Sequence, residues 1–337
     1  MKYSCLFALA AFLLPLIVNA REAIKFDDFF IDKTMRIDYF HIGDSSGEMV
    51  TIDKIYCQGI WAGSRKNLID KFNNGRYYIK IYDQATKKLI YSKGFDSYFG
   101  EYKTTKDALN GIKRTYHESV LIPYPKNKID FIVELRDREN NLSPVFTSEI
   151  DPASLTIIKE EPKDKDVKVY QTAKGGDPHQ KADIVILGEG YTAEEEQKFK
   201  NDLDRFTKVF FSNEPYKSMK HDFNIYGVFK PSMESGCDEP DHGSFRNTAL
   251  NTTFCSLGSE RYLLTEDNKA MRDLAAHVPY DAIYIMVNHN RYGGGGIYNL
   301  FCTFTSDNQW HEYLFLHESG HSFAGLADEV LYLRCCV

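Results

Sequence analysis

The chain has 337 residues, of which 43% are hydrophobic, 26% charged and 14% aromatic. This ordinary globular composition excludes general intrinsic disorder, and the length favours two domains over one. Lys and Arg number 41 against 48 Asp and Glu, and no long basic run appears, so we expect no nucleic-acid partner.

Residues 1–20 are typical of a secretory signal peptide. Lys2 provides a positive charge, an apolar stretch runs over 6–18, and Ala20 closes a cleavage-like site. No later apolar run in the sequence is long enough to cross a bilayer. We therefore predict a cleaved signal peptide at 1–20 and a mature chain without a transmembrane segment, secreted or extracytoplasmic, in the periplasm or at the cell surface.

Export would place the cysteines in a compartment where disulfides persist. Cys237 and Cys255 bracket a short loop rich in turn residues, so we expect a disulfide between them. The acidic run at 238–241 in this loop leaves calcium binding open.

The sequence from about residue 37 to residue 150 indicates an all-β domain. Runs at 77–82, 88–91 and 129–135 alternate or cluster β-branched and aromatic residues, and polar turns separate them. Short strand-like runs separated by polar turns are typical of an antiparallel β-sandwich, and we predict a β-sandwich domain at 21–155. His117 and Glu118 are interpreted as a surface pair.

The sequence pattern changes after a charged connector at 159–166, beyond which strand-like and helix-like segments alternate. An apolar strand at 182–187 leads to a helix that opens with a capping box of Thr192 and Glu195. Strands at 223–229 and 282–287 and a helix near 268–277 follow, and four glycines at 293–296 indicate a flexible loop. These elements predict α/β (α+β) architecture on a mixed sheet, in a domain at 156–337.

The strongest chemical signal is the HExxH pattern of His317, Glu318 and His321. On a helix, residues four apart share one face, so the two imidazoles project together and could hold one metal ion. Glu318 lies beside that face, where it could act as a general base without binding the ion. The alternatives to a catalytic site are that the two histidines lie on the surface without a metal ion, or that they bind a purely structural ion.

Gly325 is placed to end that helix, after which Asp328 or Glu329 could supply a third ligand. Two imidazoles and one carboxylate leave a fourth tetrahedral position open, which is the catalytic arrangement of Zn²⁺.

The chain resembles the M64, or IgA-peptidase, family of secreted zinc metallopeptidases in the segments 187–192, 288–298 and 317–329. The resemblance implies a zincin-like metallopeptidase domain behind an amino-terminal domain, with zinc on His317, His321 and Asp328 and Glu318 as the base. It also implies a protein or peptide substrate, with host immunoglobulin suggested by the family's name. Asp328 is preferred to Glu329 on the family pattern.

The mechanism expected from these residues is zinc-assisted peptide hydrolysis. We expect a strand at 297–303 to pair with the substrate backbone, and Tyr292 or Tyr298 to assist the oxyanion. The chain departs from the family pattern after Glu329, where only residues 330–337 follow, so we expect a catalytic domain that is incomplete at its C-terminus. The alternatives are an inactive truncated peptidase and a non-catalytic surface protein that binds glycan or protein.

Overall fold

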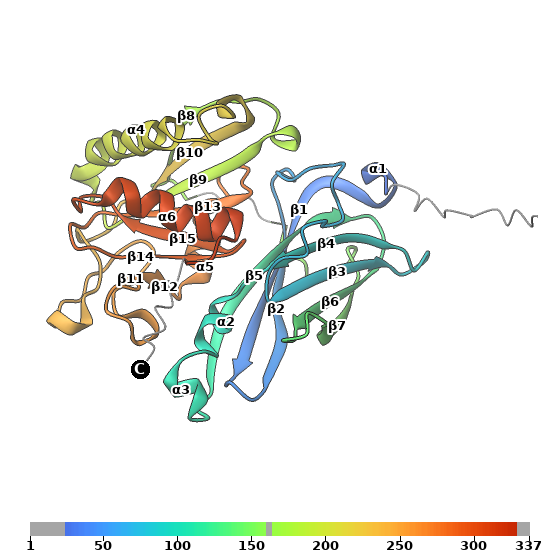
Figure 1. Cartoon of the computed structure of the whole chain (residues 1–337). Helices are drawn as coiled ribbons and strands as arrows, with labels where there is room; N and C mark the ends of the chain where they lie inside the picture. The colour runs from blue at the N-terminus through green and yellow to red at the C-terminus, as the bar shows by residue number, and fades with distance from the viewer. Residues whose placement is uncertain (1–23, 160–163, 329–337) are drawn as a thin grey trace, which may run out of the picture.

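The computed structural model describes residues 24–159, here the N-terminal region, and residues 164–328, here the C-terminal region (Figure 1). The predicted signal peptide, Glu329 and the segment 330–337 lie outside the described residues. Within the described residues no helix is long and apolar enough to cross a membrane.

Two antiparallel sheets build the N-terminal region. One has the order β2-β1-β5 and the other β4-β3-β6-β7. Side chains from both sheets, such as Ile37 and Phe131, share one hydrophobic cluster. The predicted strands correspond to β3, β4 and β6 and are confirmed. The elements are α1 (Phe26–Phe29), β1 (Phe30–Gly43), β2 (Glu48–Gln58), β3 (Tyr77–Asp83), β4 (Leu89–Phe95), α2 (Tyr98–Tyr102), α3 (Lys106–Leu109), β5 (Arg114–Pro125), β6 (Ile129–Arg136) and β7 (Leu142–Ile150).

A six-stranded mixed sheet of order β14-β15-β13-β9-β10-β8 organises the C-terminal region. The central strands β15, β13, β9 and β10 are parallel, and the outermost strands β14 and β8 pair antiparallel. The elements are β8 (Lys168–Ala173), β9 (Ala182–Glu189), α4 (Glu196–Ser212), β10 (Phe223–Phe229), β11 (Thr252–Thr253), β12 (Leu264–Thr265), α5 (Asn268–Ala275), β13 (Ala282–Val287), β14 (Gly294–Ile297), β15 (Phe301–Thr305) and α6 (His311–Ala324). The prediction of α/β architecture on a mixed sheet is confirmed.

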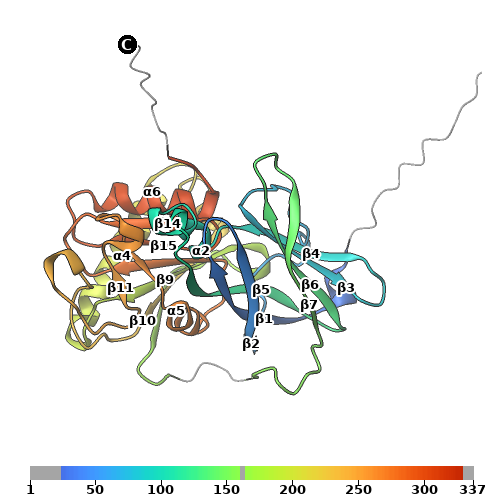
Figure 2. The same cartoon turned by 90° about the horizontal axis from the view of Figure 1, so that it is seen from below.

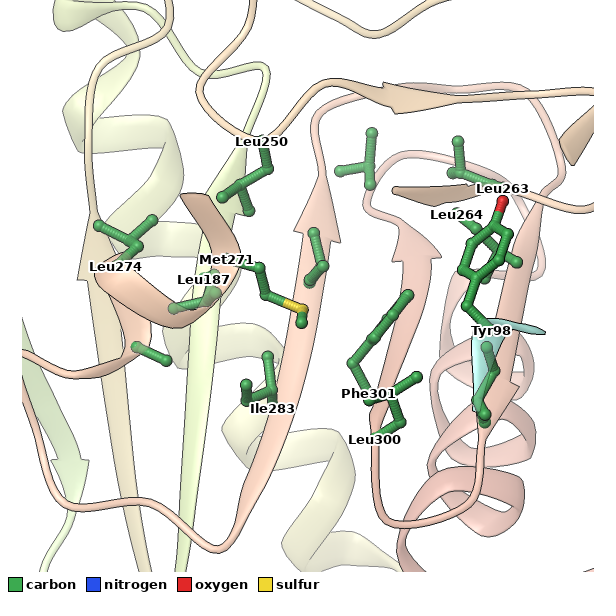
Figure 3. Packing of buried hydrophobic residues seen from close by; sticks show 14 of the residues in the cluster. Tyr98, Leu187, Leu250, Leu263, Leu264, Met271, Leu274, Ile283, Leu300 and Phe301 are labelled. Carbon is green, nitrogen blue, oxygen red and sulfur yellow. The ribbon is translucent and has the colours of Figure 1, made fainter. Parts of the chain in front are cut away.

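The helices cover both faces of this sheet, and Figure 2 shows α6 and α5 on opposite sides. Because side chains alternate along a strand, Ile184 and Ile186 pack with α4 and α6, whereas Val185 and Leu187 pack with α5. Figure 3 shows Met271 of α5 directed at the strands of Leu187 and Ile283. The predicted capping box, in which the Thr192 amide donates to Glu195, is present at the start of the helical stretch.

Two sequence-based expectations about polar residues are wrong. Glu118 is only 2% exposed, and its carboxylate accepts from the Phe99 amide at 2.8 Å and lies 3.0 Å from His41 Nδ1. It is therefore a buried residue, because β5 is covered on that side by α2. The expected disulfide is also absent, since Cys237 and Cys255 are both free thiols. Cys237 is buried in the core, whereas Cys255 lies beside Asp241.

Candidate metal centre

Helix α6 carries the residues that the sequence singled out. Its buried side, with Leu314 and Phe315, packs into the core against α4 and the sheet. The helix ends where Gly325 adopts the left-handed conformation with φ of 65°, and the Gly325 amide donates to the His321 carbonyl. This turn reverses the chain, so that Asp328 lies against the exposed side of the same helix.

The structure brings His317, His321 and Asp328 together. The two Nε2 atoms lie 3.0 Å apart, and Asp328 Oδ1 lies 3.3 Å from each of them. Ligand atoms bound at about 2.0–2.1 Å to a tetrahedral metal ion lie roughly 3.3 Å from one another. The spacing and the donor set of two imidazoles and one carboxylate therefore fit a metal ion. Glu329, the other candidate acid, lies outside the described residues.

Neighbouring groups orient both rings. His321 Nδ1 lies 2.6 Å from the Leu326 carbonyl oxygen, which can only accept, so the proton sits on Nδ1 and Nε2 keeps its lone pair. The Tyr313 ring stacks on His317, with its hydroxyl 3.4 Å from Nδ1. Burial and the nearby His321 lower the pKa of His317, although Asp328 opposes the shift. A low pKa favours the neutral imidazole, the form that binds metals.

Glu318 lies beside this group and is 8% exposed. A Cβ on Gly294 would lie 3.0 Å from Glu318 Oε1, which places the carboxylate directly against strand β14. Burial raises the pKa of Glu318 to about 8, and the charge of Asp328 adds to the rise. A carboxyl group whose pKa lies near neutrality is suited to both taking up and releasing a proton.

A cleft of about 1610 Å³ opens over the candidate centre. Tyr292 lines this cleft, but Tyr298 is not among the described residues that do, and its ring packs against Gly325. Tyr262 also lines it and was not singled out from the sequence, since a lone tyrosine in a loop carries no pattern.

The expected substrate-pairing strand at 297–303 is wrong. The strand at the sheet edge beside α6 is β14, built from the glycines that indicated a flexible loop, whereas β15 is enclosed between β14 and β13. Part of the β14 edge is already occupied, because Gly294 accepts from the Leu263 amide and donates to the Arg261 carbonyl.

The acidic loop at 238–241 is engaged with cations of the chain itself. Arg291 pairs with Glu239 at 3.1 Å and with Asp241 at 2.7 Å, and His289 lies 3.2 Å from Glu239. These carboxylates therefore tie two loops together, and nothing in their arrangement indicates a calcium site.

Two histidines and an acidic residue gathered at the end of one helix, with a second carboxylate beside them in a cleft, form the arrangement of a metal-dependent hydrolase. Two family models match the sequence, the IgA Peptidase M64 model over residues 170–334 and the Peptidase M64 N-terminus model over residues 25–147. The chain belongs to the M64 peptidase family, whose members are metallopeptidases.

Other comparisons add little. No curated protein matches the chain. Among solved structures, the crystal structure of a thermostable esterase shares 12% identity over 77% of this chain and 68% of that one. Its TM-score of 0.19 is too low to support an argument about the fold.

Proposed function

We propose that this chain is an exported, zinc-dependent endopeptidase that hydrolyses peptide bonds in proteins. The proposal divides it into a signal peptide at 1–20, a β-sandwich domain at 21–155 and a zincin-like catalytic domain at 156–337. Membership of a peptidase family supports the reaction class. The convergence of His317, His321 and Asp328 in one cleft is the observation that carries the proposal.

Zinc is the metal we propose, because a set of two histidines and one carboxylate with an open fourth position is typical of catalytic zinc. When bound, zinc supplies a Lewis acid that polarises a carbonyl and lowers the pKa of water. His317 and His321 would hold it through their Nε2 atoms and Asp328 through Oδ1. The Leu326 carbonyl keeps His321 in the required tautomer.

Glu318 moves the proton in this proposal. Its carboxylate takes a proton from the attacking water and then passes it to the nitrogen of the leaving amine. The residue lines the cleft, and its carboxylate lies directly against β14, where packing restricts its position. Tyr292 and Tyr262, both lining the cleft, are the candidates for a hydrogen bond to the developing oxyanion.

Metal content tests the centre. Purified mature chain should contain one equivalent of zinc, His317→Ala should contain little, and His311→Ala should match the wild type. His311 lies on the same helix, where its Nδ1 contacts the Asn308 carbonyl, so it controls for loss of any histidine. A folded wild type without zinc would contradict the proposal.

Turnover tests the base. Glu318→Gln should abolish cleavage of a peptide library while leaving zinc bound, and Glu312→Gln, an exposed change on the same helix, should have no effect. Immunoglobulin belongs in the substrate panel, because the matching family model is named for an IgA peptidase. If the wild type cleaves nothing, and the wild type and Glu318→Gln bind protein or glycan equally well, the chain is the non-catalytic binding protein of the alternative hypothesis.

A further inference from the structure

The N-terminal region supplies one wall of the cleft over the candidate metal centre. Figures 1 and 2 show α2 on the side of this region that faces the C-terminal region. The cleft is lined on that side by Glu101, Tyr102, Lys106, Asp107 and Arg114, and on the other by the residues of α6 and β14. A substrate lying over the metal centre would therefore contact both regions.

The segment that leads into α2 is linked to the metal-binding helix α6 through the turn between β14 and β15. Asp96 lies just before the first turn of α2, and its amide donates to the Tyr298 carbonyl at 2.9 Å. The next residue, Asn299, donates from its side chain to the Gly94 carbonyl at 2.8 Å and from its amide to the Ser322 carbonyl of α6 at 2.8 Å. The short turn between β14 and β15 thus connects α2 to the helix that carries His321.

Glu101 is the charged residue of α2 that lines the cleft. The Tyr262 hydroxyl is the one hydrogen-bond donor that reaches its carboxylate from the described residues, at 3.5 Å. The Tyr262 ring lies over β14, since a Cβ on Gly295 would come within 2.6 Å of it. Glu101 is therefore one tyrosine ring away from the strand that borders Glu318 and His321.

No cation of the described residues forms an ion pair with Glu101. The nearby guanidinium of Arg76 donates to the Gly100 carbonyl instead. Elsewhere on the same wall, Asp107 has Arg114 at 3.9 Å. Glu101 is partly buried and has no ion-pair partner among the described residues; burial raises its pKa, although the charge of Arg76 opposes the shift. Such a carboxylate gains most from a cation that arrives with a ligand.

We propose that Glu101 binds a cationic nitrogen group of the substrate and thereby determines which peptides this enzyme accepts. The group is either a Lys or Arg side chain or a free α-ammonium group, which share this chemistry. The inference rests on the proposed peptidase function, and it makes the N-terminal region part of the substrate site.

The first experiment compares zinc-loaded wild type, Glu101→Gln and the control Glu139→Gln on three peptides of otherwise equal sequence. Glu139 is an exposed acid of the N-terminal region that does not line the cleft. One is N-acetylated with an internal lysine, one is N-acetylated without basic residues, and one has a free amino terminus without basic residues. Glu101→Gln should lower kcat/KM about 10-fold to 100-fold on the peptide carrying the recognised cation and leave the neutral peptide unchanged. Glu139→Gln should match the wild type on all three.

A lower kcat/KM of Glu101→Gln on the lysine peptide alone would identify recognition of a basic side chain. A lower kcat/KM on the peptide with the free amino terminus alone would identify recognition of the α-ammonium group. An equal loss on all three peptides would overturn the inference, because it would show that Glu101 merely supports the fold. Unchanged melting temperature and zinc content in Glu101→Gln would exclude misfolding as the cause of a selective loss.

A binding measurement separates this inference from the proposed function. Fluorescence anisotropy of labelled peptides in the Glu318→Gln background needs no turnover. Weaker binding of the cationic peptide on adding Glu101→Gln would support the inference even if the wild type cleaves nothing. Equal affinity for cationic and neutral peptides with Glu101 intact would overturn it, even if the wild type is an active peptidase.

Discussion

The contact between β14 and α6 is so close that a single methyl group should disturb the candidate metal centre. A Cβ on Gly296 would lie 2.5 Å from the Glu318 carbonyl oxygen and 2.8 Å from His321 Cβ. Ordinary contact begins at 3.4 Å, so in Gly296→Ala the strand or helix must move by about 0.9 Å. Metal ligands tolerate errors of only about 0.2 Å. Overpacking of this kind costs about 1–3 kcal/mol.

We expect Gly296→Ala to lower the free energy of unfolding by that amount and the zinc affinity at least about 10-fold. Thermal unfolding and competition with a chromogenic chelator measure the two effects. Gly47→Ala is the matched control, because an added Cβ there meets no atom within 4 Å. If Gly296→Ala kept wild-type zinc affinity and stability, the packing of α6 on β14 would not position the histidines.

Three further predictions concern buried charges and the metal. Although burial disfavours its charged form, Glu118 and Glu48 raise the pKa of His41 from 6.5 to about 8. The stabilisation that protonated His41 gives the folded state is complete below pH 6.5, the unfolded pKa, and is lost as the pH rises through about 8. The free energy of unfolding should therefore fall by about 2 kcal/mol over this pH range in the wild type, and His41→Gln should not show this fall. The carboxylate of Glu189 accepts four buried hydrogen bonds, so Glu189→Ala should lower the free energy of unfolding by more than about 3 kcal/mol. The control Glu194→Ala removes an exposed carboxylate and should lower it by less than about 0.5 kcal/mol. Equal losses for the two variants in chemical denaturation would contradict this prediction. A chelator should lower the melting temperature of the wild type and zinc should restore it, and a temperature unaffected by either would argue against a bound metal.

The elements with strong local signals were predictable from the sequence. Strands β10 and β13 have the predicted bounds, and the apolar residues that recur at helical spacing in α4 are buried, namely Phe199, Leu203, Phe206 and Phe210. In each case the signal lies within one element, as an unbroken apolar run or a repeat of 3.6 residues. The approach of Asp328 to the histidines followed from a local feature too, since Gly325 ends the helix only a few residues earlier.

The features that sequence reasoning missed depend on distant contacts. Strand β14 consists largely of glycine, which has low strand propensity, and it forms because its lack of side chains lets α6 approach. The burial of Glu118 depends on α2 covering β5, and Glu101 reaches the cleft only because the two regions pack together. A residue's place between two regions leaves no periodicity in the sequence around it.

The way the two regions join argues that the N-terminal region is part of the hydrolase and not an appended module. Arg36 is 0% exposed, and its guanidinium binds Asp38 through two bonds of 2.6 Å and Asp273 of α5 through a third of 2.6 Å. Nearby, Asn268 donates to the Ser119 hydroxyl at 2.7 Å. Buried charges and amides lose their stabilisation when geometry shifts, so such an interface holds one orientation. That orientation keeps α2 opposite α6, which a separately moving binding domain would not require.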